Sequence, residues 1–480
     1  MINWSGEQQD IIDVFLGTED NIMVDATAGS GKTTLIVEGL APHMPAGSVA
    51  VSFNKKIATE LSARLNGTGV KSQTFNAFWF QFLRQRLSSG MKVDGWKVQN
   101  LVKKRIPEAE KYAFQVAKLV GLAKGEAIGI ISELSDAEQW LALIDMHEFD
   151  TEKVEVGKWV EWGIRALKLS NKDMNVIDFD DQMYFSLKLI MERGWKCDVA
   201  PVCAVDEAQD VNFLQECLIP YMGERVIAVG DRYQAIYGFR GAGTDSMSRL
   251  AETFGMTKMP MNITRRVSLA GVEYAKKFCP TIEAAEGAMQ GRVEHLSFQE
   301  MVDGLADDCL VVCRNNQPLV QIAFQLLRNG RKFEMSPRFP KALLAWLRKF
   351  KATEISELRQ RVKDWWEVER KRLESLNLTG TLSSEADKVE TILYLCKRSV
   401  DVAEIEYVIE QIMDSTGGTF LSTIHGAKGL EALDVIWLAP ELCPSKYAVQ
   451  EWQVQQETNL QFVASTRHKR DLYLVNLREK

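Results

Sequence analysis

The chain has 480 residues, enough for two to four domains, and its 46% hydrophobic and 26% charged residues are typical of soluble globular proteins. No apolar run approaches the ~18 residues that a membrane-spanning helix needs, and the opening MINWSGEQQD lacks the basic and apolar parts of a secretory signal. We therefore expect a cytoplasmic protein. The net charge of −7 argues against a globally basic nucleic-acid binder but leaves room for a local basic channel.

Apolar, strand-like runs recur with helix-like stretches between many of them, at residues 22–25, 49–53, 202–206, 226–230, 310–313 and 435–439. This alternation predicts an α/β fold with largely parallel sheets. Two long segments, 88–178 and 336–415, carry helical patterns instead and are predicted to be helical insertions. Cys309 and Cys313 flank one strand on the same face. Because the eight cysteines form no CxxC pair, we expect buried core thiols rather than a metal site.

The first strand leads into ATAGSGKTT at residues 26–34, and the helix-like LIVEGL follows. Closely spaced glycines let backbone N–H groups turn toward an anion, Lys32 adds a positive charge, and Thr33 offers a hydroxyl to Mg²⁺. The dipole of the following helix also favours an anion. An ordinary Gly/Ser turn is the alternative. The strand–loop–helix context and the intact Gly-Lys-Thr favour a nucleotide-binding P-loop.

Two later strands end in acidic residues. The run VCAV leads into Asp206 and Glu207 within DEAQD, and VIAVG leads into Asp231, with Gln234 soon after. Beside a P-loop, we expect Asp206 to hold Mg²⁺ through water and Glu207 to orient or deprotonate the attacking water. The Gln234 amide is a candidate sensor of the γ-phosphate. A solvated acidic strand end is the alternative interpretation.

In chain order, these segments and several others resemble the motif series of superfamily-one helicases of the UvrD/Rep type. The matching segments are WSGEQ at 4–8 (Q motif), ATAGSGKT at 26–33 (I), AVSFNKKIA at 50–58 (Ia), TFNAF at 74–78 (Ib), DEAQD at 206–210 (II), GDRYQAIYGFRGA at 230–242 (III), TRR at 264–266 (IV), TIHGAKGLE at 423–431 (V) and NLQFVASTR at 459–467 (VI). The match covers about half of the chain, and motifs II, III and V are individually specific.

The resemblance implies two RecA-like domains, residues 1–87 with 179–258 and residues 259–335 with 416–480, that close around ATP and Mg²⁺. Residues 88–178 would be a helical insertion of the first domain, and 336–415 a short helical accessory insertion of the second. The resemblance assigns the adenine edge to Gln8 and the ribose to Glu431. The expected nucleotide-binding residues are Gln8, Ala28, Gly29, Ser30, Gly31, Lys32, Thr33, Thr34, Arg265 and Glu431.

For catalysis the resemblance adds Arg266 and Arg467, whose charges would offset the charge that develops at the γ-phosphate. The full expected catalytic set is Lys32, Glu207, Gln234, Arg266 and Arg467, with Thr33 and Asp206 at the metal. Arg265 stands where relatives often have a Tyr that stacks on adenine, and a guanidinium can also stack on a base.

Single strands are bound by aromatic stacking and a polar or basic groove. By motif position, the expected DNA contacts are Phe53, Asn54, Lys55, Phe75, Tyr237, Phe239, Arg240 and His425. For Phe75 and Phe78 a place in the apolar core stays equally open. Segment 442–456 lies where relatives carry a strand-separating pin, so Tyr447 or Trp452 is predicted to stack on the last base pair. In the pair Trp365-Trp366, at least one ring is expected to pack against a neighbouring element.

The sequence thus predicts an ATP-dependent DNA helicase that moves 3′→5′ on single-stranded DNA, with duplex junctions and replication or recombination proteins as partners. A translocase that strips bound proteins, an ATP-gated DNA-sensing switch within a larger complex, and an RNA helicase are the alternatives. The short 336–415 insertion and the residues FNK at 53–55 and YGFRGA at 237–242 resemble compact members of the family, such as F-box DNA helicases and phage enzymes. A bacterial or phage origin follows from that compactness.

Overall fold

The computed structural model describes residues 3–477 except 53–54, 88–89, 152–153, 196–198, 237 and 239–245, and it describes Lys56 by its backbone alone. The chain divides into two compact units, Met1–Asn262 and Ile263–Lys480, called unit 1 and unit 2 below. Within the described ranges, no helix is both long and apolar enough to cross a membrane.

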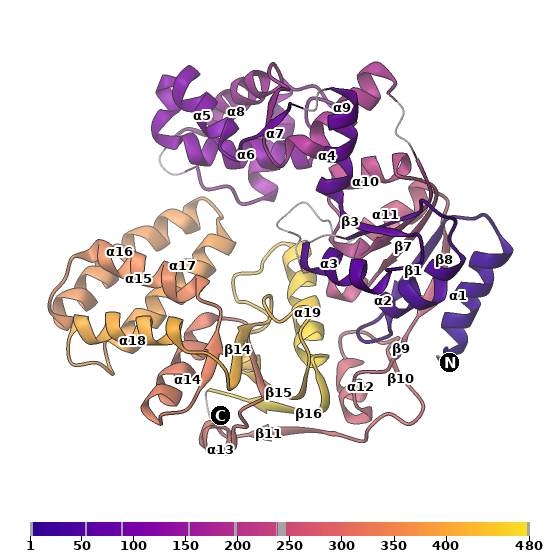
Figure 1. Ribbon diagram of the computed structural model, residues 1–480. Coiled ribbons are helices and arrows are strands. Elements are labelled where there is room, and N and C mark those ends of the chain that lie inside the picture. The colour runs from indigo at the N-terminus through magenta and orange to yellow at the C-terminus, as the bar shows by residue number, and fades with distance from the viewer. Residues whose placement is uncertain are drawn as a thin grey trace. The chain divides into compact units, whose positions relative to one another are not determined.

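In the described part of unit 1, a six-stranded parallel sheet has the strand order β3-β2-β6-β7-β1-β8 (Figure 1). Its strands are β1 (Ile22–Ala26), β2 (Val49–Ser52), β3 (Lys71–Thr74), β6 (Ala200–Asp206), β7 (Gly223–Gly230) and β8 (Thr257–Met261). Because β7 lies between β6 and β1, the carboxyl ends of these three strands are neighbours at one edge of the sheet.

Side chains that alternate along these strands enter two separate cores. Val24 packs on one face of the sheet with Ile11 of α1, whereas the adjacent Met23 packs on the other face with Trp79 of α4. The helices that cover the sheet are α1 (Gly6–Gly17), α2 (Lys32–Thr34), α3 (Lys55–Arg64), α4 (Phe75–Arg86), α9 (Asp181–Arg193), α10 (Phe213–Leu218) and α11 (Ser246–Thr253). After α2 the chain continues as a π-helix over Leu35–Leu40.

Between α4 and α9 the chain forms the helical segment of unit 1, which lies beyond the end of the sheet in Figure 1. It contains α5 (Lys97–Arg105), α6 (Ala113–Gly125), α7 (Ala137–Met146) and α8 (Val156–Ser170), with a short ladder between β4 (Lys92–Val93) and β5 (Val176–Ile177). Its core is continuous with the α4 face of the sheet. These helices occupy the range predicted as an insertion.

The described residues of unit 2 form a second six-stranded parallel sheet, in the order β11-β16-β15-β12-β14-β13. Its strands are β11 (Arg292–Leu296), β12 (Leu310–Cys313), β13 (Phe333–Met335), β14 (Thr419–Thr423), β15 (Ala432–Leu438) and β16 (His468–Val475), and a separate ladder joins β9 (Ile263–Thr264) to β10 (Glu283–Ala284). The helices are α12 (Leu269–Ala275), α13 (Phe298–Gly304), α14 (Asn316–Arg328), α15 (Arg338–Leu347), α16 (Ile355–Ser375), α17 (Thr379–Leu395), α18 (Val402–Asp414) and α19 (Glu451–Ser465).

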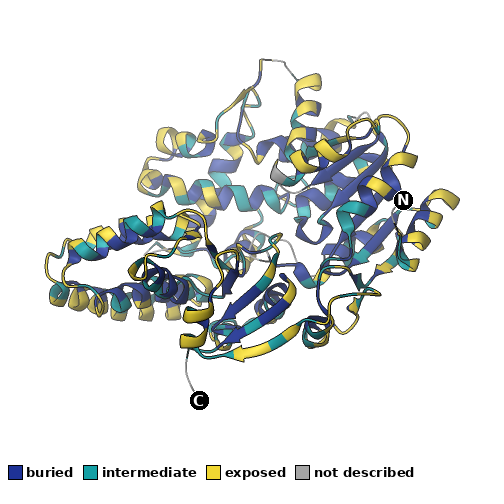
Figure 2. Ribbon diagram, turned by 60° about the horizontal axis from the view of Figure 1, so that its bottom comes forward, coloured by how far each residue is buried: buried dark blue, intermediate teal, exposed yellow. Residues whose placement is uncertain are grey.

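Helices α15 to α18 arise from the range predicted as the accessory insertion, and their apolar faces join the core of the unit 2 sheet. In Figure 2 the strands of the sheets are largely buried, and the outer faces of these helices are exposed. The fold is therefore α/β, with a parallel sheet and a mainly helical insertion in each unit, as predicted.

The structure contradicts one sequence-based prediction, a domain boundary, and confirms another, the burial of two cysteines. The predicted boundary at residue 258 is wrong, because Met259, Pro260 and Met261 belong to β8 and pair with β1 in the unit 1 sheet. The expectation of core thiols is confirmed for Cys309 and Cys313, which are buried in the unit 2 core.

Candidate nucleotide site and DNA-facing segments

The loop between β1 and α2 has the conformation that a phosphate cradle needs. Gly29 and Gly31 adopt φ values of +73° and +92°, which side-chain-bearing residues rarely adopt. A Cβ on Gly31 would lie 3.1 Å from Gln8 Nε2. Ser30 Oγ donates to Thr27 O at 2.8 Å, and Thr27 N donates to Met261 O of β8 at 3.0 Å. The loop is thus held by its own hydrogen bonds and leads directly into Lys32 at the start of α2, an arrangement that fits a phosphate group.

Gln8 is part of this loop's support. It is buried, its Nε2 donates to Ser30 O at 3.1 Å, and its Oε1 accepts from Ser5 N at 3.1 Å in a capping box at the start of α1. The Q motif therefore braces the phosphate loop through a direct hydrogen bond. The contact of Gln8 with adenine stays a prediction.

The acidic pair lies at the end of β6, two strands from β1. Asp206 is only 3% exposed, and its Oδ1 accepts from Glu207 N at 2.9 Å. Burial, and then the neighbouring Glu207 carboxylate, raise the pKa of Asp206 to about 7, while Lys32 opposes the shift. A bound divalent cation would offset the cost of ionising Asp206, so this residue fits the predicted Mg²⁺.

Glu207 has a left-handed backbone, with φ of 55°. Such a conformation is uncommon for a residue with a side chain and concentrates at functional sites. Its Oε2 accepts from Gln209 Nε2 at 2.6 Å.

A chain of hydrogen bonds continues from Glu207 to the predicted γ-phosphate sensor. Gln209 Oε1 accepts from Asp231 N at 2.9 Å, and Gln234 Nε2 donates to Asp231 Oδ2 at 2.6 Å. Asp231 is fully buried, and burial raises its pKa although Lys32 and Gln234 oppose the shift. We call Glu207, Gln209, Asp231 and Gln234 the polar relay. The sequence interpretation did not assign a role to Gln209, although this third polar residue of DEAQD was the available signal.

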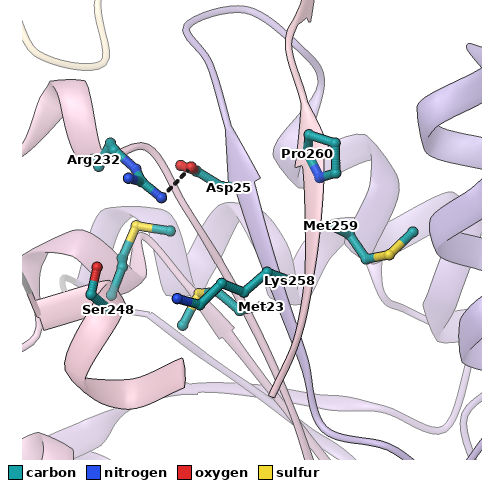
Figure 3. Close-up of a pocket in the computed structure, with 8 residues that line it drawn as sticks. Met23, Asp25, Arg232, Ser248, Lys258, Met259 and Pro260 are labelled. Atoms are coloured by element: carbon teal, nitrogen blue, oxygen red, sulfur yellow. Dashed lines mark ion pairs between the residues drawn. The ribbon is translucent and has the colours of Figure 1, made fainter. Parts of the chain in front are cut away.

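Arg232 follows Asp231, and its side chain extends toward the neighbouring strand β1. Its Nη2 lies 2.5 Å from Asp25 Oδ2 on β1, the residue before the strand's last (Figure 3). The two residues border a shallow pocket of about 150 Å³, whose other walls are Met23, Met247, Ser248, Lys258, Met259 and Pro260. The ion pair, which the sequence did not reveal, joins the start of the phosphate loop to the segment that carries Gln234.

In unit 2, Arg266 Nε donates to Glu431 Oε2 at 2.7 Å, and Lys469 Nζ lies 2.6 Å from Glu431 Oε1. Partial burial would raise the pKa of Glu431, but Lys469 and Arg266 hold it below its ordinary value. Glu431, the predicted ribose ligand, and Arg266, a predicted γ-phosphate arginine, are thus partners in one ion-pair cluster. Arg265, beside them, is exposed.

Arg467 is 1% exposed and bonds within unit 2. Its Nε donates to Val463 O at 2.9 Å, its Nη1 to Leu430 O at 3.4 Å, and its Nη2 to Thr466 Oγ1 at 3.1 Å. A role at a phosphate would require the guanidinium to leave some of these partners. That role stays a prediction.

Several predicted DNA contacts, Phe53, Asn54, Tyr237, Phe239 and Arg240, lie outside the described residues. Lys55 is exposed at the first position of α3. Phe75 is 2% and Phe78 9% exposed, both within the core that contains α4, so the core alternative holds for them. The prediction that Phe75 contacts DNA is corrected accordingly, because its buried ring offers no face to a base.

His425 follows β14 and is half-buried. Burial, with the Arg314 charge adding to it, lowers the pKa of His425 to about 3. The ring is therefore neutral at physiological pH, and any contact with a DNA backbone would be a hydrogen bond rather than an ion pair.

Comparison with known proteins identifies the family of the chain. The family model of the UvrD/REP helicase N-terminal domain matches residues 4–255, and that of the UvrD-like helicase C-terminal domain matches residues 341–479. A probable DNA helicase II homolog of Mycoplasma pneumoniae is 26% identical over 48% of this chain and 36% of its own length. DNA helicase IV of Escherichia coli is 23% identical over 54% of this chain and 45% of its own.

Among solved structures, an arterivirus nonstructural protein 10 helicase aligns over 96% of this chain and 60% of its own, at 10% identity and a TM-score of 0.36. The fold assignment rests on the strand order above rather than on this weak likeness. The chain spans less than half the length of the two curated relatives. Because the family model of the N-terminal domain covers more than half of its residues, the chain belongs to the UvrD/Rep helicase family.

Proposed function

We propose that the protein is an ATP-dependent DNA helicase that moves along single-stranded DNA in the 3′→5′ direction and couples ATP hydrolysis to duplex unwinding. The observation that carries the proposal is the meeting of three predicted catalytic segments at neighbouring strand ends of unit 1. The phosphate loop follows β1, the acidic pair ends β6, and the sensor segment follows β7. The polar relay joins the last two through hydrogen bonds.

In this proposal the loop backbone and Lys32 bind the phosphates, and Thr33 and Asp206 would hold Mg²⁺, which would neutralise phosphate charge. Glu207 orients and deprotonates the attacking water. Gln234 reports the γ-phosphate to the DNA-facing part of its own segment. Unit 2 contributes the charges of Arg266 and Arg467, and Gln8, Arg265 and Glu431 contact the nucleoside. Lys55 and His425 are the described candidates for contact with the DNA backbone.

Steady-state ATP hydrolysis tests the proposal. Turnover is measured without nucleic acid, with single-stranded DNA and with single-stranded RNA, using Lys32→Ala as the blank. Strong stimulation by DNA alone is expected, and duplexes with a 3′ or a 5′ tail then give the polarity. Turnover that no nucleic acid changes would contradict a DNA motor and favour an ATP-gated switch.

A translocase that displaces bound proteins and unwinds poorly is the second candidate. The short accessory insertion favours it, since helices α15 to α18 lie within residues 338–414. DNA-stimulated turnover with little strand separation on tailed duplexes, together with removal of a protein filament from single-stranded DNA, would select this candidate over the helicase.

A further inference from the structure

Unit 2 contains an open pocket of about 310 Å³ between helices α16 and α17 and the segment 443–450 that precedes α19. Its walls combine two aromatic rings, two cations and two carboxylates, which are Trp366, Tyr447, Arg370, Lys446, Glu374 and Glu390. The volume is at the lower end of the roughly 300–1,000 Å³ found for small-molecule sites. We call this the α16/α17 pocket.

The two aromatic walls are supported from behind. Trp366 and Tyr447 both pack against a small apolar cluster formed by Leu373, Leu378 and Leu382. Gln453 of α19 links the segment carrying Tyr447 to α17, because its Oε1 accepts from Val449 N at 3.0 Å and its Nε2 donates to Thr379 Oγ1 at 3.0 Å. The aromatic faces are therefore held in place before any ligand arrives, which lowers the entropy cost of binding.

The neighbouring tryptophans of α16 have different tasks. Trp365 packs edge-on against Trp346 at a centroid distance of 5.2 Å and against Phe350 at 6.2 Å, within the core of unit 2. Trp366 is also partly buried against that core, and in addition it lines the pocket. Both rings meet the expectation that at least one of the pair packs against another element, and Trp366 also borders the pocket.

The charged side chains at the pocket are held only weakly by their present partners. Lys446 Nζ lies 4.9 Å from the centroid of the Tyr447 ring, and Arg370 Nη1 lies 3.2 Å from Glu374 Oε1. The side chains of Arg370 and Glu374 are 45% and 47% exposed, and an ion pair of that kind contributes at most about 1 kcal/mol. Either group can therefore turn to a ligand at little cost.

This combination matches one unstacked nucleobase and its phosphate. Aromatic side chains stack on any base, because every base has a π-face, and cations beside them follow the backbone. Carboxylates accept hydrogen bonds from the exocyclic amino groups of bases. Two rings, two cations and two acceptors in one pocket supply all three kinds of contact.

We propose that the α16/α17 pocket binds a single unpaired nucleobase of a DNA strand, with its phosphate at Arg370 and Lys446. The inference rests on the proposed function and deepens it by assigning a substrate contact to the accessory helices. It also revises the predicted pin. Tyr447 acts as one wall of a two-ring pocket that takes a base already out of the helix, rather than as a lone wedge on the last base pair.

Fluorescence of 2-aminopurine tests the proposal, because stacking on an aromatic ring quenches this base. A single 2-aminopurine is moved along both strands of a forked DNA duplex that is bound by the full chain. One unpaired position is expected to be strongly quenched in the wild type. Trp366→Leu and Tyr447→Leu should each relieve that quenching and weaken fork binding by about 5-fold or more, the effect of losing one base stack. Tyr407→Leu, which removes an exposed aromatic ring on α18 outside the pocket, is the matched control.

The phosphate contact has its own paired test. Arg370→Gln should reduce the slope of log affinity against log salt by about one, the signature of one lost phosphate contact. Lys371→Gln should leave the slope unchanged, because Lys371 is the next residue of α16, pairs with Glu367 and does not line the pocket. Equal slopes for the two variants would overturn the assignment of the phosphate to Arg370.

A measurement on the wild-type chain guards against variants that fail to fold. A fork with 5-iodouracil at the quenched position should photo-crosslink to Trp366 or Tyr447. Crosslinks elsewhere, with quenching that neither leucine variant relieves, would overturn the pocket while leaving a DNA-binding motor intact. Absence of DNA binding and of DNA-stimulated turnover in the wild type would overturn the proposed function, and this site with it.

Discussion

Glu207 is the residue on which the chemistry of the proposed reaction depends. Glu207→Gln keeps the size and polarity of the side chain but removes its basicity, so ATP binding should persist and turnover should fall by at least about 100-fold. Nucleotide binding and steady-state hydrolysis are measured side by side. Glu224→Gln, an exposed glutamate on β7, is the control. Turnover near that of the wild type would show that Glu207 is not the general base.

Gln209 is expected to act through Glu207 rather than on the substrate. Gln209→Ala breaks the polar relay on both sides, so kcat should fall by about 10-fold while KM for ATP stays nearly constant. Gln209→Glu keeps an acceptor for Asp231 N but loses the donor to Glu207, and it should show a similar loss. The exposed Gln9→Ala is the control. A rise in KM with unchanged kcat would mean that Gln209 serves nucleotide binding instead.

At this scale the sequence revealed the residues whose positions are set locally. Lys32, Asp206 and Gln234 follow strand ends, and a strand followed by a short polar loop can be recognised from the residues themselves. The partners across strands were not accessible in this way. The Asp25–Arg232 ion pair joins residues far apart in the chain and exists because β1 and β7 are neighbours in the sheet. Strand order is a property of the whole unit.

Among elements, the strands that the sequence predicted are the inner ones. In unit 1 these are β1, β2, β6 and β7, and in unit 2 they are β12 and β15, whereas β14 and β16, which are also inner strands, were not predicted. Inner strands are buried on both faces and read as continuous apolar runs. Strands nearer the edges mix polar residues into the run, as KSQT does in β3 and TKMPM in β8, where Pro260 is tolerated because an edge strand has one unpaired side.

The contact between α6 and the helices of the sheet should make stability depend on pH. Burial, and then Glu216, raise the pKa of Glu126 to about 7, with Arg249 opposing. The folded state therefore holds this proton more tightly than the unfolded state, and stability is lost as pH rises from about 4.5 through 7. Glu126→Gln should stabilise the protein at pH 8 by at most about 3 kcal/mol and have little effect near pH 5.

Thermal unfolding at the two pH values measures this effect. Glu133→Gln, an exposed glutamate on the loop that follows α6, should change neither melting temperature. If Glu126→Gln destabilised the protein at pH 8, the side chain would be a net favourable partner of Arg249 and the sign of the prediction would be wrong.

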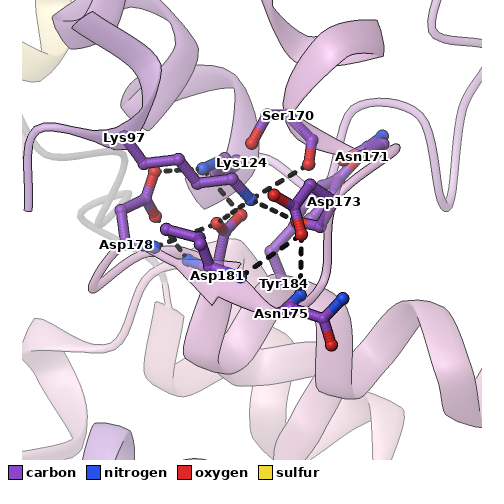
Figure 4. A network of polar contacts seen from close by, with 10 residues as sticks. Lys97, Lys124, Ser170, Asn171, Asp173, Asn175, Asp178, Asp181 and Tyr184 are labelled. Carbon is purple, nitrogen blue, oxygen red and sulfur yellow. Dashed lines mark hydrogen bonds and ion pairs between the residues drawn. The ribbon is translucent and has the colours of Figure 1, made fainter. Parts of the chain in front are cut away.

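The helical segment of unit 1 is held by buried ion pairs (Figure 4). Lys124 Nζ lies 2.6 Å from Asp178 Oδ2 and 2.7 Å from Asp181 Oδ1, and Lys97 Nζ donates to Asp181 Oδ2 at 2.7 Å. Lys124→Met would remove a positive partner from two buried carboxylates, which should lower the free energy of unfolding by about 3–5 kcal/mol. Urea denaturation measures the loss. Lys103→Met, an exposed lysine on α5, should change stability by less than about 0.5 kcal/mol. Equal midpoints for the two variants would contradict a structural role for the network.

At the scale of the whole molecule, the chain is built from parts with separate interiors. The two cores of unit 1 consist of residues from its own range, and those of unit 2 likewise. A part with its own core can fold alone. The residues proposed for catalysis are divided between the parts, with Lys32, Glu207 and Gln234 in unit 1 and Arg266 and Arg467 in unit 2.

Separating the units should therefore divide binding from turnover. Residues 1–262 alone should melt cooperatively and bind ATP, because the phosphate loop and its supports lie within them, yet hydrolyse it about 100-fold more slowly for lack of the two arginines. Residues 1–256 should be less stable, because they lack β8, which pairs with β1 and receives the Thr27 N–H through Met261 O. ATP binding by 1–262 should vanish with Lys32→Ala. Undiminished turnover by 1–262 would remove Arg266 and Arg467 from the proposed mechanism, because unit 1 would then hold every group that the reaction needs.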